Sequence, residues 1–192
     1  MSLDKYLQNN NCNIIEGYTR SCYKETMILQ LLAFDKKNIL EIGFNAGHSA
    51  DLFLSQNKES SVLSFDIGEH NYVQVAKKYI DNIYPNRHKL VLGDSTQTIP
   101  KYITDIKYDL IFIDGGHSYN IAKADIINCK KFAHKDTIVI MDDTMYKKEW
   151  EKEYTIGPTK AWLDGIKEGI ISEISHADFE PGRGISWGKY IL

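Results

Sequence analysis

Short apolar runs alternate with helix-like segments along most of the chain. Five runs are rich in β-branched residues and end in Gly or Asp, and they span residues 38–43, 62–66, 89–94, 108–114 and 137–142. Continuous runs of this length are typical of strands that are buried on both faces of a parallel sheet. Each run therefore predicts one strand of such a sheet.

Between the runs, apolar residues recur at helical spacing. Two sets stand out: Val73, Ala76, Ile80 and Ile83, and then Ala122, Ile126, Cys129 and Ala133. A further helix is expected around residues 27–34, before the first strand. The alternation of strands and helices predicts βαβ crossovers and an α/β fold with a doubly wound sheet.

The C-terminal part departs from this alternation. A helix over residues 158–167 is followed by two strand-like runs, 170–174 and 184–191, with a turn-forming stretch over 180–184 between them. Two strands joined without a helix should pair antiparallel. We therefore expect a mostly parallel seven-stranded sheet with an antiparallel C-terminal strand, and we expect Trp187 to belong to the core.

Composition narrows the class of protein. The chain has 192 residues, 43 % of them hydrophobic and 26 % charged, and a net charge of −3. This suits one domain over residues 1–192, with an N-terminal helical segment over 1–36 and a core over 37–192. Acids and bases are mixed, so there is no basic stripe for nucleic acid.

Cysteine usage and the N-terminus bear on location. Cys12, Cys22 and Cys129 are widely spaced and form no CxxC pair, which fits a reducing cytoplasm. No signal peptide and no membrane-spanning run is expected, so a membrane is not an expected partner.

Glycines and carboxylates gather at the predicted strand ends. Those at or just after the end of a run are Gly43, Asp66, Asp94, Asp114, Asp142 and Asp143. In open α/β sheets, ligands bind beyond the carboxyl ends of the strands. This edge is therefore the expected binding site.

The first two strand ends predict a nucleoside-binding edge. Gly43 and Gly47 allow a tight turn and close backbone approach, although their spacing is not that of a GxGxxG site. Asp66 follows Gly43 by 23 residues, where a carboxylate can accept both hydroxyls of a ribose. An ordinary turn and a helix N-terminal acid are the respective alternatives. Asp94 and Ser95 either face an adenine or form a plain N-cap.

Two matched segments, FIDGGHSY at 112–119 and MDDT at 141–144, are the most informative. Adjacent parallel strands lie about 5 Å apart, so Asp114, Asp142 and Asp143 can converge. Three carboxylates this close repel unless a cation sits among them. Oxygen ligands suit Mg²⁺, or Ca²⁺ and Mn²⁺, better than zinc. The alternative is that one or two of them cap the next helix.

These segments resemble class I S-adenosylmethionine-dependent methyltransferases, in the small O-methyltransferase-like branch that includes catechol O-methyltransferase-like and methyltransferase-24 type proteins. The resemblance extends from about Glu16 to the C-terminus, and IDGGHSY paired with MDDT is its most telling part. It implies a Rossmann-like core over 37–192. It also implies metal-assisted O-methylation of a small hydroxylated acceptor, such as a sugar, a phenol or a natural product.

The resemblance also assigns roles to individual residues. The implied cofactor-binding residues are Glu41, Gly43, Ala46, Gly47 and Ser49 for the methionine part, Asp66 for the ribose, Asp94 and Ser95 for the adenine, and Asp114 for the amino end. The implied metal ligands are Asp114, Asp142 and Asp143, with Mg²⁺ as the expected ion. Catechol-type enzymes usually carry Asn at the position of Asp143, so the identity of the metal stays open.

His117 occupies the position at which those enzymes carry a lysine base. Together with Asp114 it forms the expected catalytic pair, because an unprotonated imidazole can accept a proton near neutral pH. The alternative is a histidine that caps a helix or holds the loop. Acceptor selectivity is expected in Glu16–Arg20 and in residues 146–159, which form either a lid or a solvated loop. His48 is expected to face solvent.

Three other functions remain open at this point. An iron hydroxylase on the same scaffold would need two histidines and a carboxylate. A nicotinamide oxidoreductase would be expected to carry the GxGxxG fingerprint. A non-enzymatic binding module would keep the fold without the chemistry. The sequence also leaves open the acceptor and whether the chain forms a homo-oligomer.

Overall fold

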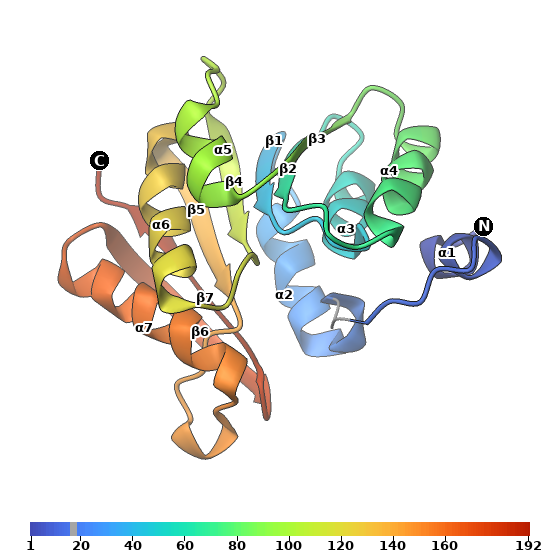
Figure 1. Ribbon diagram of the computed structural model, residues 1–192. Coiled ribbons are helices and arrows are strands. Elements are labelled where there is room, and N and C mark those ends of the chain that lie inside the picture. Colours follow the sequence, from blue (N-terminus) through green and yellow to red (C-terminus); the bar gives the residue numbers. More distant parts are fainter. Residues whose placement is uncertain (16–18) are drawn as a thin grey trace.

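A seven-stranded mixed sheet lies at the centre of the protein in the computed structural model (Figure 1). The structure describes residues 1–15 and 19–192. The strands are β1 (Asn38–Ile42), β2 (Ser61–Asp66), β3 (His88–Leu92), β4 (Tyr108–Ile113), β5 (Ala133–Asp142), β6 (Ile171–Glu180) and β7 (Arg183–Tyr190). The helices are α1 (Leu3–Asn9), α2 (Tyr23–Ala33), α3 (His48–Gln56), α4 (Tyr72–Ile83), α5 (Ser95–Lys101), α6 (Tyr119–Cys129) and α7 (Glu153–Lys167).

The strand order is β3-β2-β1-β4-β5-β7-β6. Parallel pairing joins β1 to β2 and β4, β2 to β3, and β4 to β5. Strand β7 runs antiparallel to both of its neighbours, β5 and β6. The predicted doubly wound sheet with an antiparallel C-terminal strand is confirmed, and its order reverses between β1 and β4, where such sheets bind ligands.

Helices cover both faces of the sheet, as Figure 1 shows. Successive strand residues point to opposite faces, so Ile39 packs in the layer of α2, α3 and α4, whereas Leu40 packs in the layer of α5, α6 and α7. In the described part of the chain, no helix has both the length and the apolar character needed to cross a membrane.

Several element boundaries differ from the predicted ones. Ala133 has helical spacing with Cys129, but α6 ends at Cys129 and Ala133 begins β5, where it pairs with Tyr108. Helix α7 begins at Glu153, five residues before the predicted start, and thus takes in part of the expected lid. Local periodicity does not define these ends: Ala133 pairs with a distant strand, and α7 begins where Lys152 and Thr155 form a capping box.

The expected exposure of His48 is wrong. The side chain is only 2 % exposed, and its Nε2 atom lies 2.7 Å from the Asp4 carboxylate. Helix α1 brings Asp4 over the start of α3, a contact that joins residues 44 positions apart. The N-terminal helix therefore covers a position that would otherwise face solvent.

Candidate functional site

A cavity of about 650 Å³ opens at the carboxyl edge of the sheet, at the switch point between β1 and β4. The expected site residues that line it are Gly43, Asp66, Asp94, Ser95, Asp114, His117, Asp142 and Asp143. The ends of β1 to β5 thus deliver their glycines and carboxylates to one space, as the strand pattern predicts.

Gly43 lets the ends of β1 and β4 approach closely. Its φ is +90°, and a Cβ atom there would lie 1.8 Å from the carbonyl oxygen of Asp114. An L-residue would therefore meet both unfavourable backbone geometry and a backbone overlap. At Gly43 the backbone itself therefore forms part of the cavity wall.

The other expected residues of this turn lie behind the cavity wall. Glu41, Ala46 and Ser49 are buried, and with Gly47 they are not among the residues that line the cavity. Glu41 accepts a hydrogen bond from the Ser64 hydroxyl. Burial raises the pKa of Glu41 to about 7, although the Ser49 and Ser64 hydroxyls oppose this. Their roles toward a cofactor stay predictions.

Asp66 is held firmly at the end of β2. Its Oδ2 atom accepts the backbone N–H of Asn45 at 2.8 Å, and its Oδ1 atom accepts that of Gly68 at 2.7 Å. Each carboxylate oxygen has a second lone pair. The carboxylate is therefore oriented by the chain and can still accept hydroxyls from a ligand in the cavity.

Asp94 forms the N-cap that was one of its two predicted roles. Its side chain caps α5 by accepting the backbone N–H of Thr96 at 2.8 Å. The same residue lines the cavity beside Ser95. The N-cap is therefore observed, and contact with an adenine remains a prediction.

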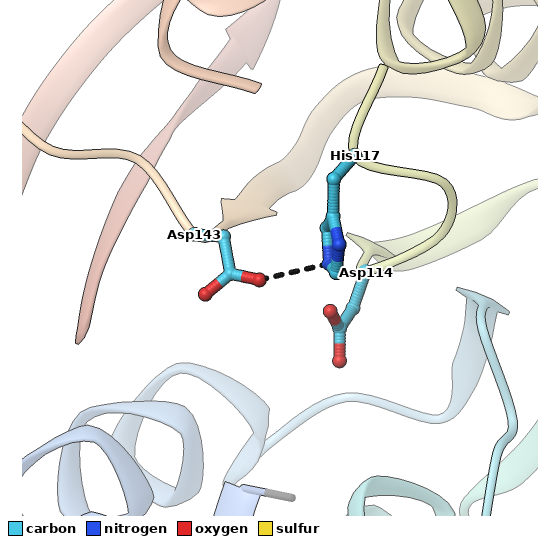
Figure 2. A group of neighbouring side chains, drawn as sticks. All are labelled: Asp114, His117 and Asp143. Carbon is cyan, nitrogen blue, oxygen red and sulfur yellow. Dashed lines mark ion pairs between the residues drawn. The ribbon is translucent and has the colours of Figure 1, made fainter. Parts of the chain in front are cut away.

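Asp114, His117 and Asp143 converge on one point from β4, the following loop and the end of β5 (Figure 2). One ligand atom from each lies within 4.8 Å of the others. His117 Nε2 lies 3.0 Å from Asp143 Oδ2. Asp143 adopts a φ of +55°, a left-handed conformation that Asp tolerates better than most residues. The group thus contains two of the three expected carboxylates and an imidazole, and Asp142 is not part of it.

Asp142 lies beside this group and also lines the cavity. Burial and the neighbouring Asp143 carboxylate together raise its pKa to about 7, although Arg183 opposes the shift. Burial likewise raises the pKa of Asp114 well above its usual range, with Asp142 and Asp143 adding to the effect. The crowded carboxylates thus favour either protons or a cation.

Helix capping does not account for these acids. The Ser118 side chain caps α6 by accepting the Ile121 N–H at 3.4 Å. After Asp143, the next described helical element is a single 3₁₀ turn at Lys148–Trp150. The capping alternative for Asp114, Asp142 and Asp143 therefore has no support in the described contacts, and the role of His117 stays a prediction.

Two charged residues at the site were not predicted. Arg183, the first residue of β7, lines the cavity, and its Nε atom lies 3.3 Å from Glu25 Oε2 on α2. Burial and the nearby Asp142 carboxylate together raise the pKa of Glu25 to about 10, although Arg183 opposes the shift. One sequence signal was available, because Glu25 shares the helix face of the buried residues Leu29 and Ala33.

One of the two stretches expected to select the acceptor is only partly described. Residues 16–18 lie outside the described residues. Thr19 lines the cavity, whereas Arg20 forms an ion pair with Asp51 at 2.5 Å. Tyr154, in the first turn of α7, lines the cavity with its ring centroid 5.7 Å from that of His117. Residues 153–159 are therefore helical and do not form a solvated loop, and a lid role for them stays a prediction.

Comparison with known proteins identifies the family. The sequence model of a family described as a methyltransferase domain matches residues 40–144, which run from β1 to the residue pair after β5. A curated protein of Mycobacterium sp. (strain JLS), provisionally described as an O-methyltransferase, is 34 % identical over 83 residues. That alignment covers 42 % of this chain and only 37 % of the relative.

Solved structures share the whole fold at low identity. Cofactor-bound Rv0187 from MTB superposes with a TM-score of 0.78 at 16 % identity, covering 98 % of this chain and 87 % of that one. The O-methyltransferase from Bacillus cereus in complex with SAH gives a TM-score of 0.72 at 21 % identity, with coverages of 97 % and 90 %. Because the family match spans more than half of the chain and all five strands that build the cavity, this protein belongs to the methyltransferase-domain family.

Proposed function

We propose that this protein is an S-adenosylmethionine-dependent methyltransferase that methylates an oxygen of a small hydroxylated acceptor with the help of a divalent metal ion. The observation that carries the proposal is the single cavity shared by Asp66, Asp114, His117, Asp142 and Asp143. The family match and the SAH complex of the Bacillus cereus relative support the choice of donor.

The β1–β2 side of the cavity fits the donor. When bound, S-adenosylmethionine supplies a methyl group on a positively charged sulfur. Asp66 would accept the ribose hydroxyls, since backbone N–H groups already orient its carboxylate. The main chain at Gly43 would pass against the amino-acid part of the donor, because no side chain stands in the way.

The β4–β5 side fits a divalent cation. Asp114, Asp142 and Asp143 are the proposed carboxylate ligands, and His117 lies within reach of the same point. Such an ion would make a neighbouring acceptor hydroxyl easier to deprotonate. Carboxylates suit Mg²⁺ or Mn²⁺, whereas an imidazole in the set brings Fe²⁺ into consideration. All three ions therefore belong in the test.

His117 is the proposed base. Its Nε2 atom lies 3.0 Å from Asp143 Oδ2, and a neutral imidazole that keeps its proton on Nε2 would have its lone pair on Nδ1. His117 would take the acceptor proton as the oxygen–methyl bond forms and the sulfur–methyl bond breaks, leaving the electron pair on sulfur. Positioning by the cavity walls supplies the rest, as expected for an in-line displacement.

Binding of the donor product tests the first part of the proposal. Calorimetric titration with S-adenosylhomocysteine should show binding by the wild-type protein and at least about tenfold weaker binding by Asp66→Ala. Asp105→Ala removes an exposed acid from the loop before β4 and should bind as the wild type does. Binding of NAD without binding of S-adenosylhomocysteine would instead support the oxidoreductase alternative and overturn the proposal.

Metal dependence tests the second part. Methyl transfer to a panel of phenols and sugars should fall in a chelator and recover with added Mg²⁺ or Mn²⁺, whereas Asp142→Ala should stay inactive in both conditions. Unchanged activity in chelator would remove the metal role. Iron in the purified protein, with hydroxylation in place of methyl transfer, would favour the hydroxylase alternative.

We also propose that residues 1–192 act as one domain in a reducing compartment. Leu3 and Leu7 of α1 are buried in the same core as Phe53 and Tyr79, which joins the N-terminal segment to the rest. Cys12, Cys22 and Cys129 are all free thiols. Limited proteolysis should therefore leave residues 1–36 attached under native conditions.

A further inference from the structure

Helix α2 carries apolar side chains on two opposite faces. Leu29 and Ala33 are buried against the sheet layer. The other face exposes Tyr23, Met27, Leu31 and Phe34, which are 74 %, 50 %, 75 % and 70 % exposed. Their spacings of four, four and three residues place them on one stripe. A helix that is apolar all round is normally covered on both sides.

This outer stripe, Tyr23, Met27, Leu31 and Phe34, differs from ordinary surface hydrophobics. Apolar residues scattered singly over a surface are common and need no explanation. Four large side chains in a row on one helix form a contiguous patch, which marks an interaction surface. The stripe faces away from the cavity, because Glu25 on the buried face of α2 is the residue that reaches Arg183.

The charges beside the stripe fit a second copy of the same helix. Lys24 and Asp35 are both exposed. They lie eleven residues apart, which is about three helical turns, so they share one flank of the stripe. Along the chain, the midpoint between Lys24 and Asp35 lies within one residue of the midpoint of the stripe. Asp35 contacts its neighbour Lys36 at 2.7 Å, but the Asp35 side chain is 73 % exposed and can be reached from outside.

We propose that two copies of this chain associate through the outer stripe, with their α2 helices antiparallel about a two-fold axis. Such an axis brings the same patch of each subunit into contact. When the axis passes through the midpoint, a residue that precedes the midpoint on one helix lies opposite the residue that follows it by the same distance on the partner's helix. Both residues lie on the same flank. Lys24 therefore faces Asp35 of the partner subunit, and the same ion pair forms a second time by symmetry.

The mass of the protein in solution tests this inference independently of the proposed function. Sedimentation velocity between about 1 and 100 µM should show a species of about 44 kDa, twice the 22.0 kDa of one chain. Leu31→Glu should sediment as a monomer with an unchanged circular dichroism spectrum. Ile103→Glu, at a 93 % exposed position in the loop after α5, is the matched control and should remain a dimer.

Charge reversal tests the antiparallel arrangement itself. Lys24→Asp should weaken the dimer by about tenfold or more, because two acids would then face each other at each end. The double variant Lys24→Asp, Asp35→Lys should restore wild-type association. A wild-type monomer at the highest concentration, a dimer that survives Leu31→Glu, or a double swap that fails to rescue would each overturn the proposal. So would a monomer that binds phosphatidylcholine vesicles through the stripe.

Discussion

The two halves of the cavity edge treat their carboxylates in opposite ways. At the end of β2, Asp66 accepts two backbone N–H groups. At the ends of β4 and β5, burial and mutual repulsion raise the pKa of Asp114 and Asp142. The first half is satisfied by the chain itself, whereas the second holds acids that a proton or a cation would stabilise.

This contrast separates a binding role from a chemical one. Groups that are already hydrogen-bonded keep one geometry and can recognise a ligand without rearrangement. Crowded acids store unfavourable charge interactions that a bound ion or proton relieves. Donor recognition is therefore expected to depend on the rigid half, and the proposed proton and metal chemistry on the crowded half.

The largest expected effect is at Gly43, where the two halves meet. Gly43→Ala should lower the free energy of unfolding by about 4 kcal/mol or more, because its Cβ would overlap the Asp114 carbonyl. Gly169→Ala also has a positive φ, but it has open space around its Cβ, and it should cost only about 1 kcal/mol. Urea denaturation measures both, and equal losses would show that the close approach does not matter.

The second prediction concerns Glu41, a buried acid behind the cavity wall on β1. The folded-state pKa of Glu41 is raised to about 7 from 4.5, so the folded protein binds a proton that the unfolded chain has lost. Its stabilising effect is complete below pH 4.5 and is lost as the pH rises through about 7. Glu41→Gln should remove this decline, which is on the order of 3 kcal/mol.

Free energies of unfolding measured at several pH values provide the check. Glu59→Gln is the matched control, since Glu59 is an exposed acid that pairs with Lys37 on the surface. Its curve should keep the wild-type decline with pH. Other acids with raised pKa, such as Asp142, keep part of the decline in every variant. If the Glu41→Gln curve falls with pH as steeply as the wild-type curve, the Glu41 carboxyl is ionised when folded and burial does not raise its pKa.

The third prediction addresses the crowded half. His117→Ala should slow methyl transfer by about 100-fold, because the proposed base is lost. Stability should change by less than about 0.5 kcal/mol, since the side chain is 46 % exposed. His176→Ala, which removes another partly exposed histidine far along the chain on β6, should leave the rate unchanged. A normal rate in His117→Ala would end its assignment as the base.

The smallest expected effect is at Ser118, and it distinguishes the capping role of Ser118 from the proposed catalytic role of the neighbouring His117. Ser118→Ala should lower stability by about 1 kcal/mol, because Ser118 caps α6. Ser172→Ala, at an exposed position on β6, should have little effect. Thermal unfolding gives the comparison. If His117→Ala costs as much stability as Ser118→Ala, His117 holds the loop and the contrast between the halves weakens.

Much of the architecture was predictable because its signals are local. The five apolar runs mark β1 to β5, and parallel pairing then brings their terminal acids to one edge. The C-terminal pair followed from two runs without a helix between them. Helix ends were less predictable, as Ala133 and Glu153 show, since packing against other elements decides them.

The finer geometry of the site was beyond local signals. The pairing of His117 with Asp143 depends on a loop and on the left-handed backbone at Asp143. The approach of Arg183 to Glu25 joins β7 to α2 across most of the chain. The burial of His48 required Asp4 from the N-terminal helix. Each of these contacts joins segments that are far apart in the sequence, and the hydrophobic periodicity of a segment does not say which distant segment it will approach.

The sequence by itself determined that this protein is a layered α/β protein with a carboxylate-rich edge, because strand and helix periods and strand-end residues are encoded within short windows. Only the tertiary structure decided which of these acids are satisfied and which are crowded. Burial and the approach of distant groups control that difference, and both depend on how the crossovers pack around the sheet.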